Sequence, residues 1–429
     1  MFLRSVFFLA TMLTLSACDD SGGRADGAII DRDDRPPSAF SEVLTGADVL
    51  VQSGFQELKG MRVGLIVNHT SRSNGRHLID LMHESSNVTI AALFGPEHGI
   101  RGDEDAGAKI ADGIDDATGA PVYSLYGENR SPTPEMLRGV DALVFDIQDV
   151  GSRFYTFIST MGLAMKSAAK AGIPFYVLDR PNPLGGVTME GKELDTTLVS
   201  FVGQYPIPTR YGLTAGELSQ MILGEAWIPD LGYMDLQIIE MTGWHRDMLW
   251  PDTGMEWIPS SPNIPTFESA LMYAGTCFFE ATSASEGRGT PAPFLTVGAP
   301  WMDASRLAAL DFPGLAIEAI QITPISIPGK STYPKWENVP LNAVSISVMQ
   351  PDQVRSVGAG LELISRTYAQ LPNSVITTFF NESWMAKLSG SHETVSALKK
   401  GWSARDFEAA WAQELADFDQ KRQKYLLYD

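Results

Sequence analysis

Short apolar runs that alternate with helical stretches between residues 61 and 241 constrain the fold of this chain more than any other feature. Several of these runs lack polar alternation, which is typical of strands that are buried on both faces of a parallel sheet. Strands separated by helices in this way predict a doubly wound, mostly parallel, Rossmann-like α/β domain. The runs are at residues 61–67, 88–94, 121–126, 141–147, 173–179 and 235–241.

Helix signals lie between the runs. Thr133 is followed by a proline, which predicts the start of a helix. Residues 157–172 are amphipathic and end in a glycine, as many helices do. Thr214 and Glu217 have the spacing of a capping box, in which the two side chains satisfy the first free amides of a helix.

The alternation of strands and helices stops over residues 250–300. Pro, Gly and Trp are frequent there and predict a loop-rich segment that could line a cleft. Strands and helices are expected again beyond it. We therefore expect a Rossmann-like catalytic domain over residues 41–264 and a smaller α+β auxiliary domain over residues 265–429. The later elements are predicted at residues 316–327, 342–350, 352–370 and 403–424.

The N-terminus has the pattern of an export signal. One basic residue precedes an apolar stretch that is too short to span a bilayer, and small residues lead to Cys18. "LSAC" resembles the bacterial lipobox, which implies removal of residues 1–17 and lipid attachment at Cys18. Residues 18–40 are rich in Gly, Asp, Arg and Pro and predict a flexible tether. We expect a membrane-anchored lipoprotein facing the periplasm, with the choice between inner and outer membrane left open.

Charge and motifs exclude several functions. The net charge of −20 argues against a nucleic-acid partner, although a few local arginines could still bind an acidic small molecule. No dinucleotide fingerprint, P-loop or serine-hydrolase elbow is present, so no cofactor is expected. The six histidines lack the spacing of a metal site, so no metal is expected either. The sequence leaves the oligomeric state open.

Polar residues follow four of the predicted strands. In a parallel sheet these positions meet at the carboxyl edge, where ligands of such folds bind. Helix capping and turn formation would explain about half of these residues, but not all of them together. The sequence therefore predicts a site at this edge. The residues are Asn68 after the first run, Glu97 and His98 after the second, Asp146, Asp149 and Arg153 after the fourth, and Arg180 and Asn182 after the fifth.

Carboxylate chemistry remains as the best fit. Glycoside hydrolysis uses one carboxyl as the proton donor and a second group as base, nucleophile or electrostatic partner. Glu97 follows a proline and precedes a histidine, so its backbone is restrained and it has a neighbour that could hydrogen-bond it. Glu280 and Glu286 could reach the same cleft from the second domain, together with Arg288 between two glycines.

Several long motifs resemble one family. "ALFGPEHGIRGDEDAG", "DALVFDIQDVGSRFYTFISTM", "PFYVLDRPNPLGG", "EGRGTPAPF" and the terminal "KRQKYLLY" are similar to those of the exo-β-N-acetylmuramidases, and the resemblance runs from about residue 61 to the end. It implies release of N-acetylmuramic acid from the non-reducing ends of peptidoglycan fragments, in cell-wall turnover and recycling. It also implies a Rossmann-like domain, an auxiliary domain and a cleft between them.

The resemblance implies roles for single residues. Glu97 matches the family's catalytic candidate and is the expected general acid, with His98, Glu286 and Asp149 as the other catalytic candidates. Tyr211 stands where the family pattern has a histidine, and Glu280 lies in a run that also departs from the pattern. The expected substrate-binding residues are Asn68, Arg101, Arg153, Arg180, Asn182, Tyr211, Glu280 and Arg288.

The substrate's lactyl carboxylate calls for a cation, ideally an arginine that binds it with two hydrogen bonds. Arg153 and Arg288 are the first candidates, and Arg101, Arg180 and Arg210 are the others. A substrate-assisted route and a two-carboxylate route both stay open. Two other functions also stay open: a lipid-anchored protein that binds muropeptides without cleaving them, and a metal-dependent hydrolase.

Overall fold

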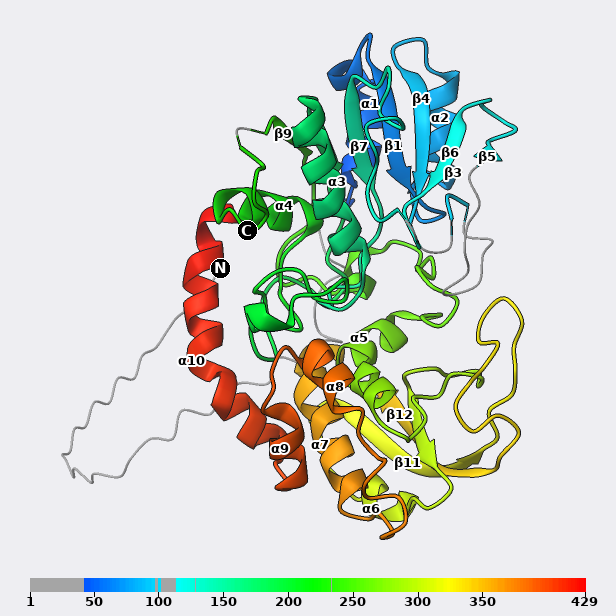
Figure 1. The fold of residues 1–429 in the computed structure, drawn as a ribbon, viewed down its shortest axis with the longest axis vertical. Coiled ribbons are helices and arrows are strands. Elements are labelled where there is room, and N and C mark those ends of the chain that lie inside the picture. Colours follow the sequence, from blue (N-terminus) through cyan, green and yellow to red (C-terminus); the bar gives the residue numbers. More distant parts are fainter. Residues whose placement is uncertain (1–41, 97–98, 102–112, 128, 233) are drawn as a thin grey trace, which may run out of the picture. The chain divides into compact units, whose positions relative to one another are not determined.

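The computed structural model describes residues 42–96, 99–101, 113–127, 129–232 and 234–429. Its larger sheet has seven strands in the order β5-β6-β4-β1-β7-β8-β9 (Figure 1). All neighbouring strands are parallel except β5 and β6. The chain moves outward from β1 to β4 and β6, then returns to the other side of β1 with β7, so the winding reverses between β1 and β7. This is the predicted doubly wound sheet.

Alternating side chains of the central strands supply two cores. Leu65 and Val144 face the side covered by α1 and α2, whereas Ile66 and Phe145 face the side covered by α3 and α4. The strands are therefore apolar on both faces, which explains the continuous apolar runs in the sequence. The elements of this domain are α1 (Gly46–Gln52), β1 (Arg62–Val67), β2 (Arg72–Ser73), β3 (Arg76–His77), α2 (Leu78–Glu84), β4 (Thr89–Gly95), β5 (Gly113–Ile114), β6 (Pro121–Ser124), β7 (Ala142–Asp146), α3 (Phe157–Ala171), β8 (Phe175–Leu178), α4 (Ala215–Gly224) and β9 (Leu236–Ile239).

The predicted helix boundaries are confirmed in two places and wrong in one. The helix α3 ends at Gly172 in the left-handed conformation, and Thr214 and Glu217 form the capping box of α4. The helix predicted from Thr133 is a series of turns. Gly139 adopts a φ of 73° and the chain then enters β7, so too few residues remain for a stable helix.

The second domain has a three-stranded antiparallel sheet in the order β10-β12-β11. Helix α7 packs on α5, and glycines make this close approach possible. A Cβ on Gly275 would lie 1.7 Å from the carbonyl oxygen of Ser356. The predicted strands at 316–327 and 342–350 and the two later helices are confirmed. The elements are α5 (Phe267–Thr276), β10 (Thr296–Ala299), α6 (Ala304–Ala308), β11 (Leu315–Ile322), β12 (Leu341–Val348), α7 (Ser356–Tyr368), α8 (Glu382–Ser389), α9 (Thr394–Lys399) and α10 (Ala404–Arg422).

Residues 41–429 form one compact unit, and one apolar core runs through both domains. After α10 the chain returns to the first domain, where the Tyr428 hydroxyl donates to Asp179 Oδ2 at 2.7 Å. Within the described ranges, no helix is long and apolar enough to cross a membrane. Short 3₁₀ helices lie at Gln56–Leu58, Thr196–Leu198, Trp250–Thr253, Cys277–Ala281, Pro351–Gln353 and Gln423–Tyr425.

Candidate functional site

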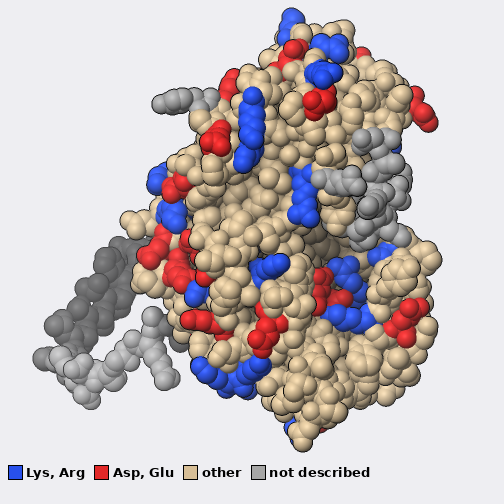
Figure 2. All heavy atoms as spheres, viewed as in Figure 1, with Lys and Arg blue, Asp and Glu red and all other residues tan. Residues whose placement is uncertain are grey.

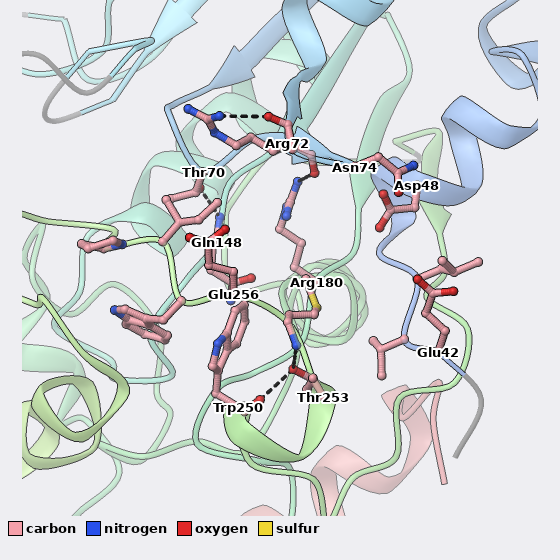
Figure 3. A pocket seen from close by; sticks show the side chains of 18 residues that line it. Glu42, Asp48, Thr70, Arg72, Asn74, Gln148, Arg180, Trp250, Thr253 and Glu256 are labelled. Atoms are coloured by element: carbon pink, nitrogen blue, oxygen red, sulfur yellow. Dashed lines mark hydrogen bonds between the residues drawn. The ribbon is translucent and has the colours of Figure 1, made fainter. Parts of the chain in front are cut away.

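The carboxyl ends of β1, β7 and β8 carry a cavity of about 560 Å³ at the point where the winding of the sheet reverses. Thr70, Gln148 and Arg180 line it from the three strand ends, and Trp250 lines it from the 3₁₀ helix Trp250–Thr253. Figure 3 shows the side chains of Gln148, Arg180 and Trp250 converging on this space from different segments. Ligands of doubly wound folds bind at such a reversal. The predicted site edge is therefore hollow.

Hydrogen bonds within the turn after β1 fix the backbone next to the cavity. Asn68 follows β1 and is buried, and its Oδ1 accepts from the amide and the hydroxyl of Thr70 at 2.9 and 2.6 Å. The Ser71 hydroxyl donates to the carbonyl of Asp146 at the end of β7. These bonds tie the loop after β1 to the next strand, so Asn68 shapes the wall of the cavity and does not line it.

Arg180 is held under the cavity by Asp146. The two side chains form a double hydrogen bond, with Nε–Oδ1 at 2.6 Å and Nη2–Oδ2 at 2.9 Å. Nη2 of Arg180 also donates to the carbonyl of Arg72 at 3.2 Å, which Figure 3 shows as a dashed line. Burial raises the pKa of Asp146, and the charge of Arg180 opposes that shift. Because the guanidinium already has a carboxylate partner, its charge is largely compensated.

Asp149 lies beneath the same edge in a buried pair with Tyr211. Its Oδ2 accepts from the Tyr211 hydroxyl at 2.5 Å and from the amide of Gly151 at 2.7 Å, whereas Oδ1 has no partner among the described residues. Burial raises the pKa of Asp149 to about 6, although the hydrogen bond from Tyr211 opposes the shift. An acid of this kind can be neutral or charged near physiological pH.

Arg153 is in a position that argues against its predicted contact with the lactyl carboxylate. The side chain is fully buried. Its guanidinium donates to the carbonyls of Lys192 and Ile207 in the first domain and of Leu388 in the second, at 2.7, 2.7 and 2.9 Å. Burial lowers its pKa to about 9. The structure therefore gives Arg153 a role in joining the two domains.

Other predicted binding residues also have internal partners. Arg210 is buried and pairs with Glu190, with Nη1–Oε1 at 3.2 Å. The side-chain amide of Asn182 bonds the backbone of Leu184 and Leu213. Arg101 pairs with Asp115 at 3.0 Å and with Asp80 at 3.4 Å on a partly exposed surface. None of these three predicted residues lines the cavity.

A group of charged side chains gathers in the second domain, and we call it the Glu286 cluster. It consists of Glu280, Glu286, Arg288 and Lys335. Glu286 is buried and lies 3.5 Å from Nε of Arg288 and 3.0 Å from Nζ of Lys335. Arg288 also pairs with Glu280 at 2.9 Å, and the two carboxylates raise the pKa of Arg288 although burial alone would lower it. Figure 2 shows basic and acidic side chains meeting in a hollow on this half of the molecule.

Residues 259–263 connect the cavity to the loop that carries Lys335 of the Glu286 cluster. Pro259 lines the cavity, and its carbonyl lies 2.6 Å from Nε2 of His69. The amide of Asn263 donates to the carbonyl of Lys330 at 2.6 Å, in the loop that carries Lys335. The predicted loop-rich segment thus forms part of the site wall, and its contacts join the sheet edge to the loop that carries Lys335.

Glu97, His98 and Cys18, which carry the central predictions, lie outside the described residues. The strand β4, which pairs with β1, ends at Gly95, at the same carboxyl edge of the sheet. The catalytic role of Glu97 and the lipid anchor at Cys18 therefore stay predictions. In the part of the chain that is described, no group of three or more His, Cys, Asp or Glu residues has the arrangement of a metal site.

Two basic residues near the site were missed by sequence reasoning. Arg72 lines the cavity, is exposed, and bonds the carbonyls of His69 and Gly75 without a carboxylate partner among the described residues. Lys335 contacts Glu286 from a loop between two strands. Arg72 directly follows the "NHTS" run at the end of β1, so its place in the sequence was a usable signal. Lys335 gave no such signal, because only docking of its loop brings it to Glu286.

Comparisons with known proteins agree with this architecture. Two family models match the chain, "Exo-beta-N-acetylmuramidase NamZ, N-terminal" over residues 63–268 and "NamZ, C-terminal" over residues 271–428. The peptidoglycan beta-N-acetylmuramidase NamZ of Bacillus subtilis is 38% identical over 432 aligned positions, which cover 100% of this chain and 98% of that protein.

Two solved structures of DUF1343 family proteins from Bacteroides fragilis are also similar. One has a TM-score of 0.82 at 38% identity and covers 90% of this chain and 99% of its own. The other has a TM-score of 0.76 at 31% identity and covers 91% of this chain and 99% of its own. The fold, the matched ranges and the full-length identity lead to one conclusion: this chain belongs to the exo-β-N-acetylmuramidase (NamZ) family of glycoside hydrolases.

Proposed function

We propose that this protein removes N-acetylmuramic acid from the non-reducing ends of peptidoglycan fragments, with Glu97 as the general acid. The full-length identity to a peptidoglycan β-N-acetylmuramidase carries the proposal. The hollow carboxyl edge supports it, because Glu97 follows β4 by two positions in the sequence and β4 ends at that edge. A role in cell-wall turnover and recycling follows from this substrate.

Glu286 is the best supported second carboxylate. It is buried and contacts two cations, Arg288 at 3.5 Å and Lys335 at 3.0 Å, so a carboxylate at this position has its charge compensated by direct partners. In a two-carboxylate route it would act as base or nucleophile, and in a substrate-assisted route it would orient the acetamido group. Asp149 is less suited to touch the sugar, because Tyr211 and the Gly151 amide already occupy one of its oxygens.

The lactyl carboxylate has two candidate cations. Arg288 belongs to the Glu286 cluster and keeps 28% of its side chain exposed. Arg72 is at the rim of the cavity, and its side chain bonds two backbone carbonyls and no carboxylate among the described residues. A cation without a competing acid binds a new carboxylate at lower cost, which favours Arg72.

The test uses residues 41–429 and two chromogenic substrates, a β-N-acetylmuramide and the matching β-N-acetylglucosaminide. We expect turnover of the first and not of the second, because only the muramide carries the lactyl carboxylate. Glu97→Gln should lower kcat by about 100-fold or more, the range typical of a lost general acid. Circular dichroism of the variant should match the parent, so that the loss can be assigned to chemistry.

Two results would contradict the proposal. Failure to turn over either substrate, together with calorimetric binding of muropeptides, would identify a binding protein instead. Activity that disappears with a chelator and returns with a divalent cation would identify a metal-dependent hydrolase. Analysis of the anomeric product then separates retention from inversion.

We also propose a lipid anchor at Cys18, on the basis of the "LSAC" pattern and the tether that follows it. Cys18→Ala should move the full chain from the membrane fraction to the soluble fraction of the expressing cell. An unchanged membrane fraction would exclude the anchor.

A further inference from the structure

The loop between β11 and β12, residues 323–340, is much longer than the two to five residues that usually join antiparallel strands (Figure 1). Long ordered loops in compact domains are most often functional. This loop carries Lys335, whose ammonium group contacts Glu286 at 3.0 Å. It also carries Tyr333, which is 91% exposed and has no interaction partner among the described residues.

The loop is fixed in place along its length. Near its start, the Ile325 amide donates to the carbonyl of Gly289, at 3.0 Å. In its middle, the carbonyl of Lys330 accepts from Asn263, at 2.6 Å. Near its end, the indole of Trp336 donates to the carbonyl of Ser283, at 2.7 Å. An exposed aromatic ring on a loop held by these bonds is already positioned for binding, which lowers the entropy cost of a contact.

Pro334 brings the loop against the "EGRG" turn. A Cβ on Gly289 would lie 2.7 Å from the Pro334 ring, so this contact needs a glycine. Tyr333 precedes Pro334 and is two positions from Lys335, which limits its Cα to about 7 Å from that of Lys335. Tyr333 is therefore the chain neighbour of Pro334, which packs on the "EGRG" turn, and is two positions from Lys335, which contacts Glu286, while its own ring is open to solvent.

We propose that Tyr333 binds the sugar ring on the leaving-group side of the cleaved bond, an uncharged N-acetylhexosamine. This inference rests on the proposed function. An enzyme that removes one terminal sugar places that sugar in the site, and the rest of the fragment leaves past the rim. A phenol ring there offers an apolar face to the pyranose and a hydroxyl to its polar groups. The uncharged ring needs no compensating charge, and Tyr333 provides none.

The experiment compares two substrates that differ only after the cleaved bond. N-acetyl-β-muramyl fluoride has a leaving group of one atom, and the disaccharide has N-acetylmuramic acid β-linked to N-acetylglucosamine. Tyr333→Ala should lower kcat/KM for the disaccharide by roughly tenfold, the loss of one good aromatic contact, and should change the value for the fluoride by less than about twofold. Tyr333→Phe keeps the apolar face and loses the hydroxyl, so its loss on the disaccharide should be smaller than that of Tyr333→Ala.

Met349→Ala is the matched control, because Met349 is also exposed, at 66%, in the same domain but outside the loop. It should change neither value. Equal losses on both substrates with Tyr333→Ala would overturn the proposal, since they would indicate a structural effect on the Glu286 cluster. No loss on either would overturn it too. A loss that appears only with peptide-bearing fragments, or a change in sedimentation, would identify a peptide or a second copy as the occupant instead.

Affinity measurements test the role of Tyr333 independently of the proposed catalytic activity. Calorimetry with the disaccharide and with free N-acetylmuramic acid needs no turnover, so it can be read even if the parent protein is inactive. A selective loss of disaccharide affinity in Tyr333→Ala supports the leaving-group site in either case. Equal affinities of parent and variant for the disaccharide would overturn it while leaving the catalytic test unaffected.

Discussion

Buried charged groups near the sheet edge have specific hydrogen-bond partners, and these partners determine what each residue can do. Arg153 donates to backbone carbonyls in both domains, Arg180 pairs with Asp146, and one oxygen of Asp149 accepts from a hydroxyl and an amide. An ion buried without such partners would be far more costly. Residues that are already satisfied internally support the site, whereas the exposed cation of Arg72 is available to a ligand.

Asp149 should make the stability of the protein depend on pH. Its pKa is raised from 3.8 to about 6 by burial, so between these values the folded state binds more protons than the unfolded state. Stability from this group is therefore present at low pH and is lost as the pH rises from about 4 to about 6. Asp149→Asn should remove this loss. The free energy of unfolding of the variant, relative to that of the parent, should therefore rise by up to about 3 kcal/mol between pH 4 and pH 7.

Urea unfolding of the parent and of Asp149→Asn at several pH values measures this effect. The relevant quantity is how the difference between their free energies of unfolding changes with pH. Asp311→Asn, at an exposed carboxyl before β11, is the control and should leave the difference constant. A difference between parent and Asp149→Asn that does not change with pH would show that Asp149 does not titrate in this range.

Glu286 and Glu280 offer a paired test at the residue scale. Both contact Arg288, but only Glu286 is buried and only Glu286 also contacts Lys335. Glu286→Gln should lower kcat by about 100-fold, whereas Glu280→Gln should change kcat by less than about tenfold. Steady-state kinetics on the muramide substrate measure both. Similar kcat values for the parent and Glu286→Gln would remove Glu286 from the catalytic step.

At the scale of elements, the segment after α10 acts as a strap on the first domain. Tyr428 donates to Asp179, and its hydroxyl accepts from the amide of Met241 at 3.0 Å. The amide of Leu427 donates to Glu217, in the capping box of α4. Asp179 directly precedes Arg180, so the end of the chain stabilises the strand end that carries the cavity.

Tyr428→Phe should therefore destabilise the protein by about 1–3 kcal/mol, because it leaves a buried carboxylate and a buried amide each with one partner fewer. Chemical denaturation measures the change. Tyr333→Phe removes the same hydroxyl from an exposed ring and should cost nothing measurable. Equal stability of the parent and Tyr428→Phe would show that the strap is not held by this hydroxyl.

At the scale of the whole molecule, the two domains share one apolar core and are joined by Arg153. Two units that share a core cannot unfold separately without exposing it. We expect residues 41–429 to unfold in one calorimetric transition, with equal calorimetric and van't Hoff enthalpies. Arg153→Met should shift that transition to lower temperature without splitting it. Two resolved transitions in the parent would contradict this expectation.

Much of the fold could be predicted from the sequence because its signals are local. Apolar runs marked the six parallel strands, and Thr214 with Glu217 marked the start of α4. The helix predicted from Thr133 was wrong because a left-handed Gly139 and the start of β7 leave it no room. Local signals fix the type of an element, but its length also depends on where the next element must begin.

The sequence by itself determined the alternation of strands and helices, the polar edge and the resemblance to one family, since each follows from residues that are close along the chain. Only the tertiary structure decided which polar residues face a ligand. Arg153 and Arg72 are both arginines that follow a strand, yet one is buried against carbonyls of two domains and the other is at the rim of a cavity. Burial and partners depend on contacts between distant segments, as for Lys335 and Glu286, and no local pattern encodes them.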